Sequence, residues 1–119
     1  MATEADVERL ALALPGVVQE GSSYRVGGKL LAWSWLERVH PKRARLANPD
    51  VLVVRVANEA RKFELVAMEP DVFFTEPHYN GYAAILVRLP SITVEHLREV
   101  LDEGWQARAP KELRGRVAG

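Results

Sequence analysis

The feature that most constrains the fold is a run of six residues, Val51 to Val56, in which four of the six are valine. Branched side chains of this kind favour extended strands over helices. A second apolar run, Ala83 to Leu89, places Ile85, Val87 and Leu89 on one side because side chains alternate along a strand. We therefore expect two strands here.

Three other segments carry the apolar spacing of amphipathic helices. We expect these helices from about Thr3 to Leu14, from Glu59 to Met68, and from the N-cap Thr93 through Trp105. Thr3, Asn58 and Thr93 can each cap the helix that follows. The spacing turns Phe63, Val66 and Ala67 inward on the second helix, and Trp105 inward on the third. Pro110 ends the third helix or starts a short turn through Leu113.

The segment between the first helix and Val51 predicts a hairpin. Tyr24 to Val26 and Leu30 to Trp35 flank Gly27-Gly28, a two-residue turn signal. The period of two places Trp33 and Trp35 on one face, together with Leu31. We expect two short extended segments, Val17 to Glu20 and Val72 to Thr75. We also expect a polar connection from Glu37 to Pro49.

The order of helix, strands, helix, strand, helix predicts an α+β fold with helices on one face of a mainly antiparallel sheet. The 119 residues suit a single domain, residues 1–119, in which 115–119 are expected to be frayed.

Composition excludes several classes of function. Lys plus Arg equals Asp plus Glu at 16 each, which disfavours strong non-specific binding of nucleic acid. The chain has no cysteine, which removes disulfides and thiolate metal sites and suits a reducing cytoplasm. The acidic N-terminus lacks the pattern of a signal peptide, and no apolar run is long enough to span a membrane. We therefore expect a cytoplasmic protein with no membrane partner.

An ordered set of motifs resembles the MmcQ/YjbR family. The set comprises Leu14-Pro15-Gly16-Val17, Tyr24-Arg25-Val26-Gly27-Gly28-Lys29, Pro77-His78-Tyr79-Asn80-Gly81-Tyr82 with Val87-Arg88-Leu89, and Ala109-Pro110-Lys111. The resemblance covers nearly the whole chain, although the segment from Leu31 to Leu36 is less polar than in many members. It implies a CyaY-like, frataxin-like sandwich, also described as a double-wing fold, and a DNA-binding role by analogy of fold. It supplies no catalytic residues.

The loop from Glu76 to Tyr82 is the first candidate site. His78, Tyr79, Asn80 and Tyr82 bring an imidazole, two phenols and an amide together, which suits a small-molecule ligand. The same residues also suit a plain turn, because Pro77 fixes φ and Asn80-Gly81 accept positive φ. Both interpretations stay open, and Arg25 or Arg88 could join a ligand site.

Two basic segments are the second candidate. Residues that could contact phosphates are Arg38, Lys42, Arg43 and Arg45 in one segment, and Lys111 and Arg114 in the other. Solvated charges that keep the protein soluble would give the same pattern.

Metal and cofactor sites are not predicted. The chain has three scattered histidines and no cysteine, so we expect no transition-metal site and no cofactor. The acids Glu4, Asp6 and Glu8 suit the start of a helix and do not share one helical face.

The sequence thus favours a non-enzymatic binding module that contacts DNA weakly and in a salt-sensitive way. A small-molecule-binding protein or enzyme using the His78–Tyr82 loop is the alternative. A protein-interaction module working through an exposed Trp33–Trp35 face is a third possibility, with the chain a monomer or weak homodimer.

Overall fold

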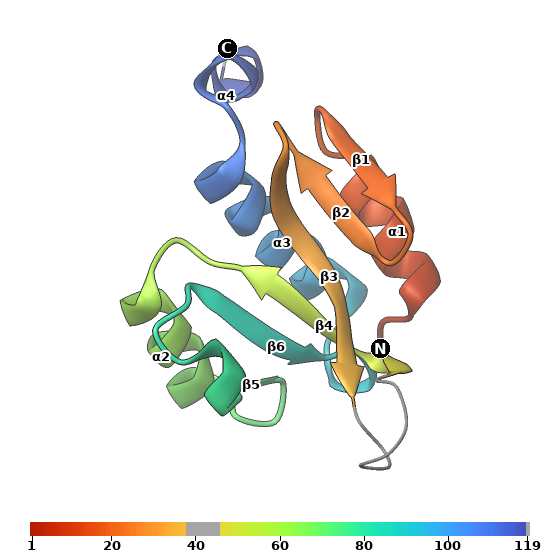
Figure 1. The fold of residues 1–119 in the computed structure, drawn as a ribbon, viewed down its shortest axis with the longest axis vertical. Coiled ribbons are helices and arrows are strands. Elements are labelled where there is room, and N and C mark those ends of the chain that lie inside the picture. The colour runs from red at the N-terminus through yellow and green to blue at the C-terminus, as the bar shows by residue number, and fades with distance from the viewer. Residues whose placement is uncertain (38–45, 119) are drawn as a thin grey trace.

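A six-stranded sheet, with strands in the order β1-β2-β3-β4-β6-β5, forms the centre of the protein. A computed structural model describes residues 1–37 and 46–118 of the chain (Figure 1). The strands are β1 (Val17–Glu20), β2 (Ser23–Val26), β3 (Lys29–Glu37), β4 (Leu46–Arg55), β5 (Phe73–Phe74) and β6 (Ala84–Arg88). Every pair of neighbouring strands is antiparallel, which confirms the predicted type of sheet.

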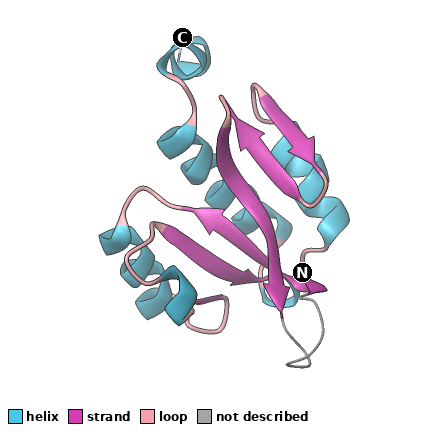
Figure 2. Ribbon diagram, viewed as in Figure 1, coloured by secondary structure: helices cyan, strands magenta, loops and turns pink. Residues whose placement is uncertain are grey.

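The helices are α1 (Glu4–Leu12), α2 (Glu59–Met68), α3 (Val94–Arg108) and α4 (Lys111–Ala118), with two 3-10 turns, η1 (Pro77–Tyr79) and η2 (Leu89–Ser91). α1 and α3 lie together behind the sheet in Figure 2, where helices are cyan and strands magenta. α3 contacts β3 and β4, and one continuous apolar core joins these elements. The predicted α+β class, with helices on one face, is therefore confirmed.

The predicted helix caps hold. Thr3 and Asp6 form a reciprocal capping box at the start of α1, since each side chain binds the other residue's backbone N–H. The side chains of Asn58 and Thr93 accept hydrogen bonds from backbone N–H groups of the first turns of α2 and α3. Trp105 is fully buried, as predicted, and its indole Nε1 donates to the Pro15 carbonyl at 2.8 Å. This bond ties the end of α3 to the turn after α1.

A β-bulge in β3 overturns one expectation. Tyr24 and Arg25 are neighbours on β2, but they pair with Ala32 and Leu30, so Leu31 is an extra residue on β3. Leu31 and Ala32 both have no exposed surface and both belong to the main core. Leu31 therefore does not share a face with the tryptophans, because the bulge shifts the alternation by one residue.

Other differences concern the second helix and the strand before it. Phe63, predicted inward, is 58% exposed and Ala67 is exposed, whereas Lys62 is only 1% exposed. α2 is thus rotated so that Lys62 and Leu65 face the protein. β4 begins at Leu46, inside the segment expected to be a polar connection. Beyond Pro110 the chain forms the helix α4 through Ala118 and not only a short turn.

α3 approaches the sheet most closely at Gly104. A Cβ atom on this residue would lie 2.7 Å from the Arg55 carbonyl oxygen and 3.2 Å from Leu31 Cδ1. Real Cβ atoms do not come so close to backbone, so only glycine allows this crossing. Glycine has a weaker helix propensity than other residues, but at this position it allows α3 to contact β4 directly.

We predict that Gly104→Ala destabilises the protein by about 1–3 kcal/mol, since the overpacking outweighs the gain in helix propensity. Urea unfolding gives the measurement, with Gln106→Ala, an exposed position of α3, as the control. A Gly104→Ala protein as stable as the parent would show that α3 does not pack on β4 in this way.

Candidate functional site

The face of the sheet opposite α1 and α3 carries a second apolar cluster. Val51, Val53, Ala84 and Leu86 are buried there and belong to β4 and β6. They alternate with core residues such as Leu52, as expected for a sheet covered on both faces. Partly buried aromatic side chains pack on this cluster, namely Trp33, Trp35, Phe74 and Tyr79. We call this surface the aromatic face.

β3 contributes two of the four aromatic rings. Because Trp33 and Trp35 follow the bulge and are two residues apart, both point to the aromatic face, as predicted. The Trp33 ring lies 6.1 Å from the Tyr79 ring, and the Trp35 ring meets Phe74 edge-on at 6.2 Å. Such edge and tilted arrangements are favourable for aromatic pairs.

The loop from Glu76 to Tyr82 folds as the turn that its composition predicts. Pro77 starts η1, and Asn80-Gly81 form the centre of a second turn with φ of +77° at Gly81. The Tyr82 backbone N–H donates to the Tyr79 carbonyl at 3.0 Å across this turn. The backbone therefore presents His78 and Tyr79 toward the end of β3.

The side chain of Lys62, on α2, binds the backbone of this loop. Its Nζ donates to the carbonyl oxygens of Tyr79 at 2.7 Å and Tyr82 at 3.0 Å. Burial lowers the pKa of Lys62, and the nearby Glu59 partly opposes this effect. The ammonium group thus fixes the position of the loop that carries the candidate site residues.

A cavity of about 310 Å³ lies between β3 and η1. It is lined by Trp33, Ser34, Trp35, Leu36, His78 and Tyr79. The Trp33 indole Nε1 donates to the Tyr79 hydroxyl at 3.1 Å, and the His78 ring meets the Tyr79 ring edge-on at 5.0 Å. The walls are therefore mainly aromatic, and the His78 imidazole and the Tyr79 phenol are among the polar groups that line them, a composition typical of small-ligand sites.

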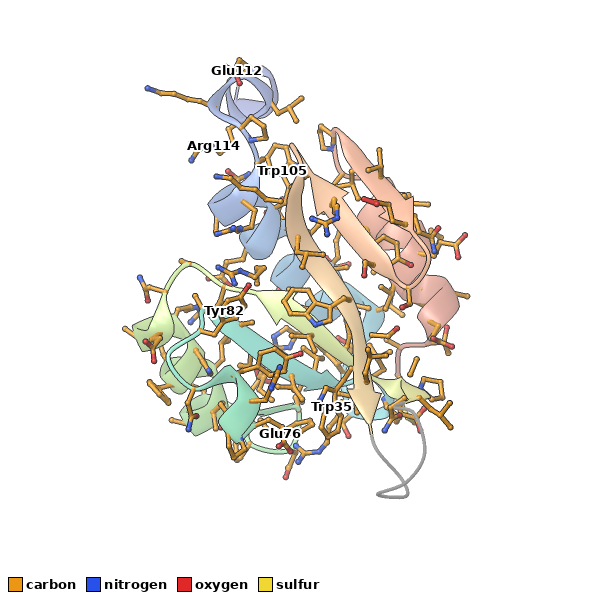
Figure 3. All side chains as sticks on the ribbon, viewed as in Figure 1. Trp35, Glu76, Tyr82, Trp105, Glu112 and Arg114 are labelled. Carbon is orange, nitrogen blue, oxygen red and sulfur yellow. The ribbon has the colours of Figure 1, made fainter. Side chains whose placement is uncertain are left out.

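The structure brings only some of the predicted site residues together. His78 and Tyr79 line the cavity, whereas Asn80 and Tyr82 are exposed and do not. The Tyr82 ring lies 6.2 Å from Tyr79 and stacks on Arg55 instead. Figure 3 shows Tyr82 and Trp35 toward opposite ends of the sheet.

Only one of the two predicted basic segments lies within the described residues. Arg38, Lys42, Arg43 and Arg45 lie outside the described residues, so their role stays a prediction. Lys111 and Arg114 are exposed on α4, which lies at the top of Figure 1, whereas β3 ends and β4 begins in the lower part of the picture. The two arginines considered near the loop also have other partners, since Arg25 pairs with Glu20 and Arg88 covers Phe74.

Sequence reasoning missed two residues that shape the aromatic face. Phe74 lies in a segment that the sequence predicts only to be short and extended, and Lys62 is not among the residues predicted to face inward on α2. A usable signal for Phe74 was its neighbour Phe73, because two successive rings in a strand must face opposite sides. Lys62 offered no local signal, since its acceptors lie 17 and 20 residues further along the chain.

A larger cavity of about 380 Å³ lies elsewhere, between α1 and strands β2 and β4. Its lining includes Glu4, Glu8, Gln19 and Tyr24. Burial and the two glutamates raise the pKa of Tyr24, so the phenol is held in its protonated form. This cavity has a single aromatic side chain and offers less for ligand recognition than the aromatic face.

Within residues 1–37 and 46–118, no three His, Asp or Glu side chains are grouped so that they could hold a metal ion. Over the same residues, none of the helices combines the length and apolar character needed to cross a lipid bilayer.

The fold and the aromatic face together define a small α+β domain with a partly open aromatic cavity. The YjbR family model matches residues 12–107, and the chain belongs to this family. Uncharacterized proteins of Mycobacterium bovis and Mycobacterium tuberculosis are 42% identical over 120 residues, which cover 95% of this chain and 93% of the relative. The family resemblance predicted from the sequence is thereby confirmed.

The fold is also similar to a solved structure. The crystal structure of Deinococcus radiodurans protein DR2400, which carries the family-model domain DUF419, matches with a TM-score of 0.69. The match covers 99% of this chain and 89% of that chain at 20% sequence identity. At this identity the likeness concerns the fold alone.

We predict that Tyr79→Phe lowers the free energy of unfolding by about 0.5–1.5 kcal/mol, because Trp33 Nε1 loses its acceptor. Tyr82→Phe is the matched control, since the Tyr82 hydroxyl makes no hydrogen bond within the described part of the chain. Urea unfolding of the three proteins decides the matter. Equal losses in both variants would contradict the role of the Trp33–Tyr79 bond.

Proposed function

We propose that this YjbR-family protein is a binding protein whose ligand inserts a planar ring between the tryptophans of β3 and the side chains of η1. The single observation that carries the proposal is the cavity of about 310 Å³ lined by Trp33, Trp35, His78 and Tyr79. Its volume lies at the lower end of the range for small-molecule sites, which suits one or two rings.

The preorganisation of the cavity supports this proposal. The Trp33–Tyr79 hydrogen bond holds one wall, and the contact between Trp35 and Phe74 holds the other. Lys62 fixes the backbone of the loop, so binding requires little ordering of side chains. His78 is exposed at the rim and offers a nitrogen donor or acceptor to the edge of a heteroaromatic ring. The role is binding, and no residue is assigned to catalysis.

We predict that a planar heteroaromatic ligand found by a thermal-shift screen loses its effect in Trp35→Ala. At about a hundred times the Kd, such a ligand stabilises the folded protein by about 2.7 kcal/mol, which is readily measured. Phe63→Ala removes an exposed aromatic ring from α2, away from the cavity, and should keep the full response. A response that survives in Trp35→Ala and His78→Ala would place the ligand elsewhere.

A second candidate function is DNA binding, which the family resemblance implies. Lys111 and Arg114 support it because both are exposed on α4, and the segment with Arg38, Lys42, Arg43 and Arg45 would add further cations. Bases of a single strand could also stack on Trp33 and Trp35. The double-wing, CyaY-like description belongs to this proposal, as does a cytoplasmic location.

We expect such binding to be weak and to fall with salt, with Arg43→Ala and Arg45→Ala each lowering the log–log slope by roughly one. Fluorescence anisotropy with duplex and single-stranded oligonucleotides at several salt concentrations provides the test. Arg9→Ala is the control, because Arg9 lies on α1 and pairs with Asp6. Undetectable affinity for both forms of DNA at low salt would exclude this function.

A protein-interaction role through the same tryptophans is the third candidate. Half-buried Trp33 and Trp35 next to the exposed Leu36 form an apolar surface that a protein could cover. A molar mass that rises with concentration, and that no longer does so in Trp35→Ala, would favour this role.

A further inference from the structure

Arg55 is a buried cation whose Nε and Nη1 atoms have no hydrogen-bond partner in the described part of the chain. It ends β4 and is only 9% exposed. Its Nε and Nη1 atoms are buried, and neither has a hydrogen-bond partner among the described residues. Buried guanidinium groups are normally paired with carboxylates, carbonyls or other acceptors, so this arrangement calls for an explanation.

A second arginine adds to the same region. Arg108 lies in the last turn of α3, and its Nε is also buried without a partner in the described part of the protein. Gly104 sits one turn earlier and touches the Arg55 carbonyl, which brings the end of α3 to the end of β4. The end of β4, which carries Arg55, and the last turn of α3, which carries Arg108, are therefore neighbours at this edge of the sheet.

Within residues 1–37 and 46–118, no acidic side chain offsets the charge of Arg55. Burial and the repulsion from Arg108 lower the pKa of Arg55, and only Tyr82 opposes these effects. Arg61 of α2 shows the contrast, because its guanidinium is paired with the carboxylates of Glu103 and Glu64. Arg55 has instead the ring of Tyr82, whose centroid lies 4.2 Å from its Cζ.

We propose that Arg55 and Arg108 form a binding site for a dianionic phosphate group, either free inorganic phosphate or the phosphate of a small monoester. Two guanidinium groups that have no acidic partner among the described residues match a dianion, and their N–H groups suit the oxygens of phosphate. The unpaired Nε atoms of both residues become hydrogen-bonded when the anion binds.

Tyr82 controls access to this site. Its ring covers the Arg55 guanidinium, whereas the residue itself is 43% exposed at the surface. Rotation of this one side chain opens the path from solvent to Arg55. Figure 3 shows Tyr82 at the same end of the sheet as the end of α3.

The site is separate from the aromatic cavity and does not depend on the function proposed above. Neither Arg55 nor Arg108 lines the cavity of Trp33, Trp35 and His78. The Tyr79 ring lies between the two regions, 6.2 Å from Tyr82. Trp35→Ala should therefore leave phosphate binding unchanged, so the two proposals can fail independently.

The test uses the whole protein, with inorganic phosphate, phenyl phosphate and dimethyl phosphate as probes at constant ionic strength. NMR spectra of the arginine Nε–H groups report directly on Arg55 and Arg108 without any mutation. We expect inorganic phosphate or phenyl phosphate, but not the monoanionic dimethyl phosphate, to shift both Nε–H signals with saturation. A stronger response to phenyl phosphate than to inorganic phosphate would identify a monoester as the ligand.

Variants then separate binding from a structural role. Arg55→Met and Arg108→Met should each weaken phosphate binding by roughly tenfold or more. The matched control Arg98→Met, which removes an exposed arginine of α3 that pairs with Glu95, should bind phosphate as the parent does. In phosphate-free buffer, Arg55→Met should have an equal or higher melting temperature, because it removes a buried unpaired charge.

Three results would contradict the phosphate site. Nε–H signals of Arg55 and Arg108 that do not move with saturating phosphate would overturn it. So would equal phosphate affinity in Arg55→Met and the parent protein. A lower melting temperature of Arg55→Met together with an unresponsive parent would show that Arg55 serves only to fill space beneath Tyr82.

Discussion

The bulge at Leu31 is the constraint on which the arrangement of both faces depends. One extra residue in β3 allows Leu31 and Ala32 to enter the main core together, and it turns Trp33 and Trp35 to the opposite face. Without it, strict alternation would place Leu31 beside the tryptophans. The same strand therefore supplies the packing surface for α3 and the wall of the aromatic cavity. Bulges commonly re-aim side chains in this way next to functional sites.

Two other contacts fix the surroundings of the aromatic face. Gly104 lets α3 lie directly on β4, so that α3 packs on the face of the sheet opposite the aromatic face. Lys62 holds the loop after η1 from the side of α2, and the loop in turn places Tyr79 against Trp33. The cavity is thus built on two rigid strands and a pinned loop, an arrangement that favours binding without large rearrangement.

Much of the fold could be predicted from the sequence, because its signals are local. The caps Thr3, Asn58 and Thr93 mark the helix starts, and the valine-rich run marks the centre of β4. The bulge could not be predicted, since it depends on pairing with β2. The orientation of α2 was wrong for a similar reason: Lys62 is buried because distant carbonyl groups accept its hydrogen bonds. Of the predicted site residues, His78 and Tyr79 line the cavity, but their partners Trp33 and Trp35 come from another strand.

The central claim is that the aromatic face is the ligand-binding surface, and the indole N–H signals of the three tryptophans test it most directly. Trp33 and Trp35 line the cavity, whereas Trp105 is fully buried on the other side of the sheet. In a ¹H–¹⁵N NMR titration with a heteroaromatic ligand, the Trp33 and Trp35 signals should shift with one common saturation curve, and the Trp105 signal should stay in place. A ligand that saturates the protein without moving the Trp33 and Trp35 signals would contradict the claim.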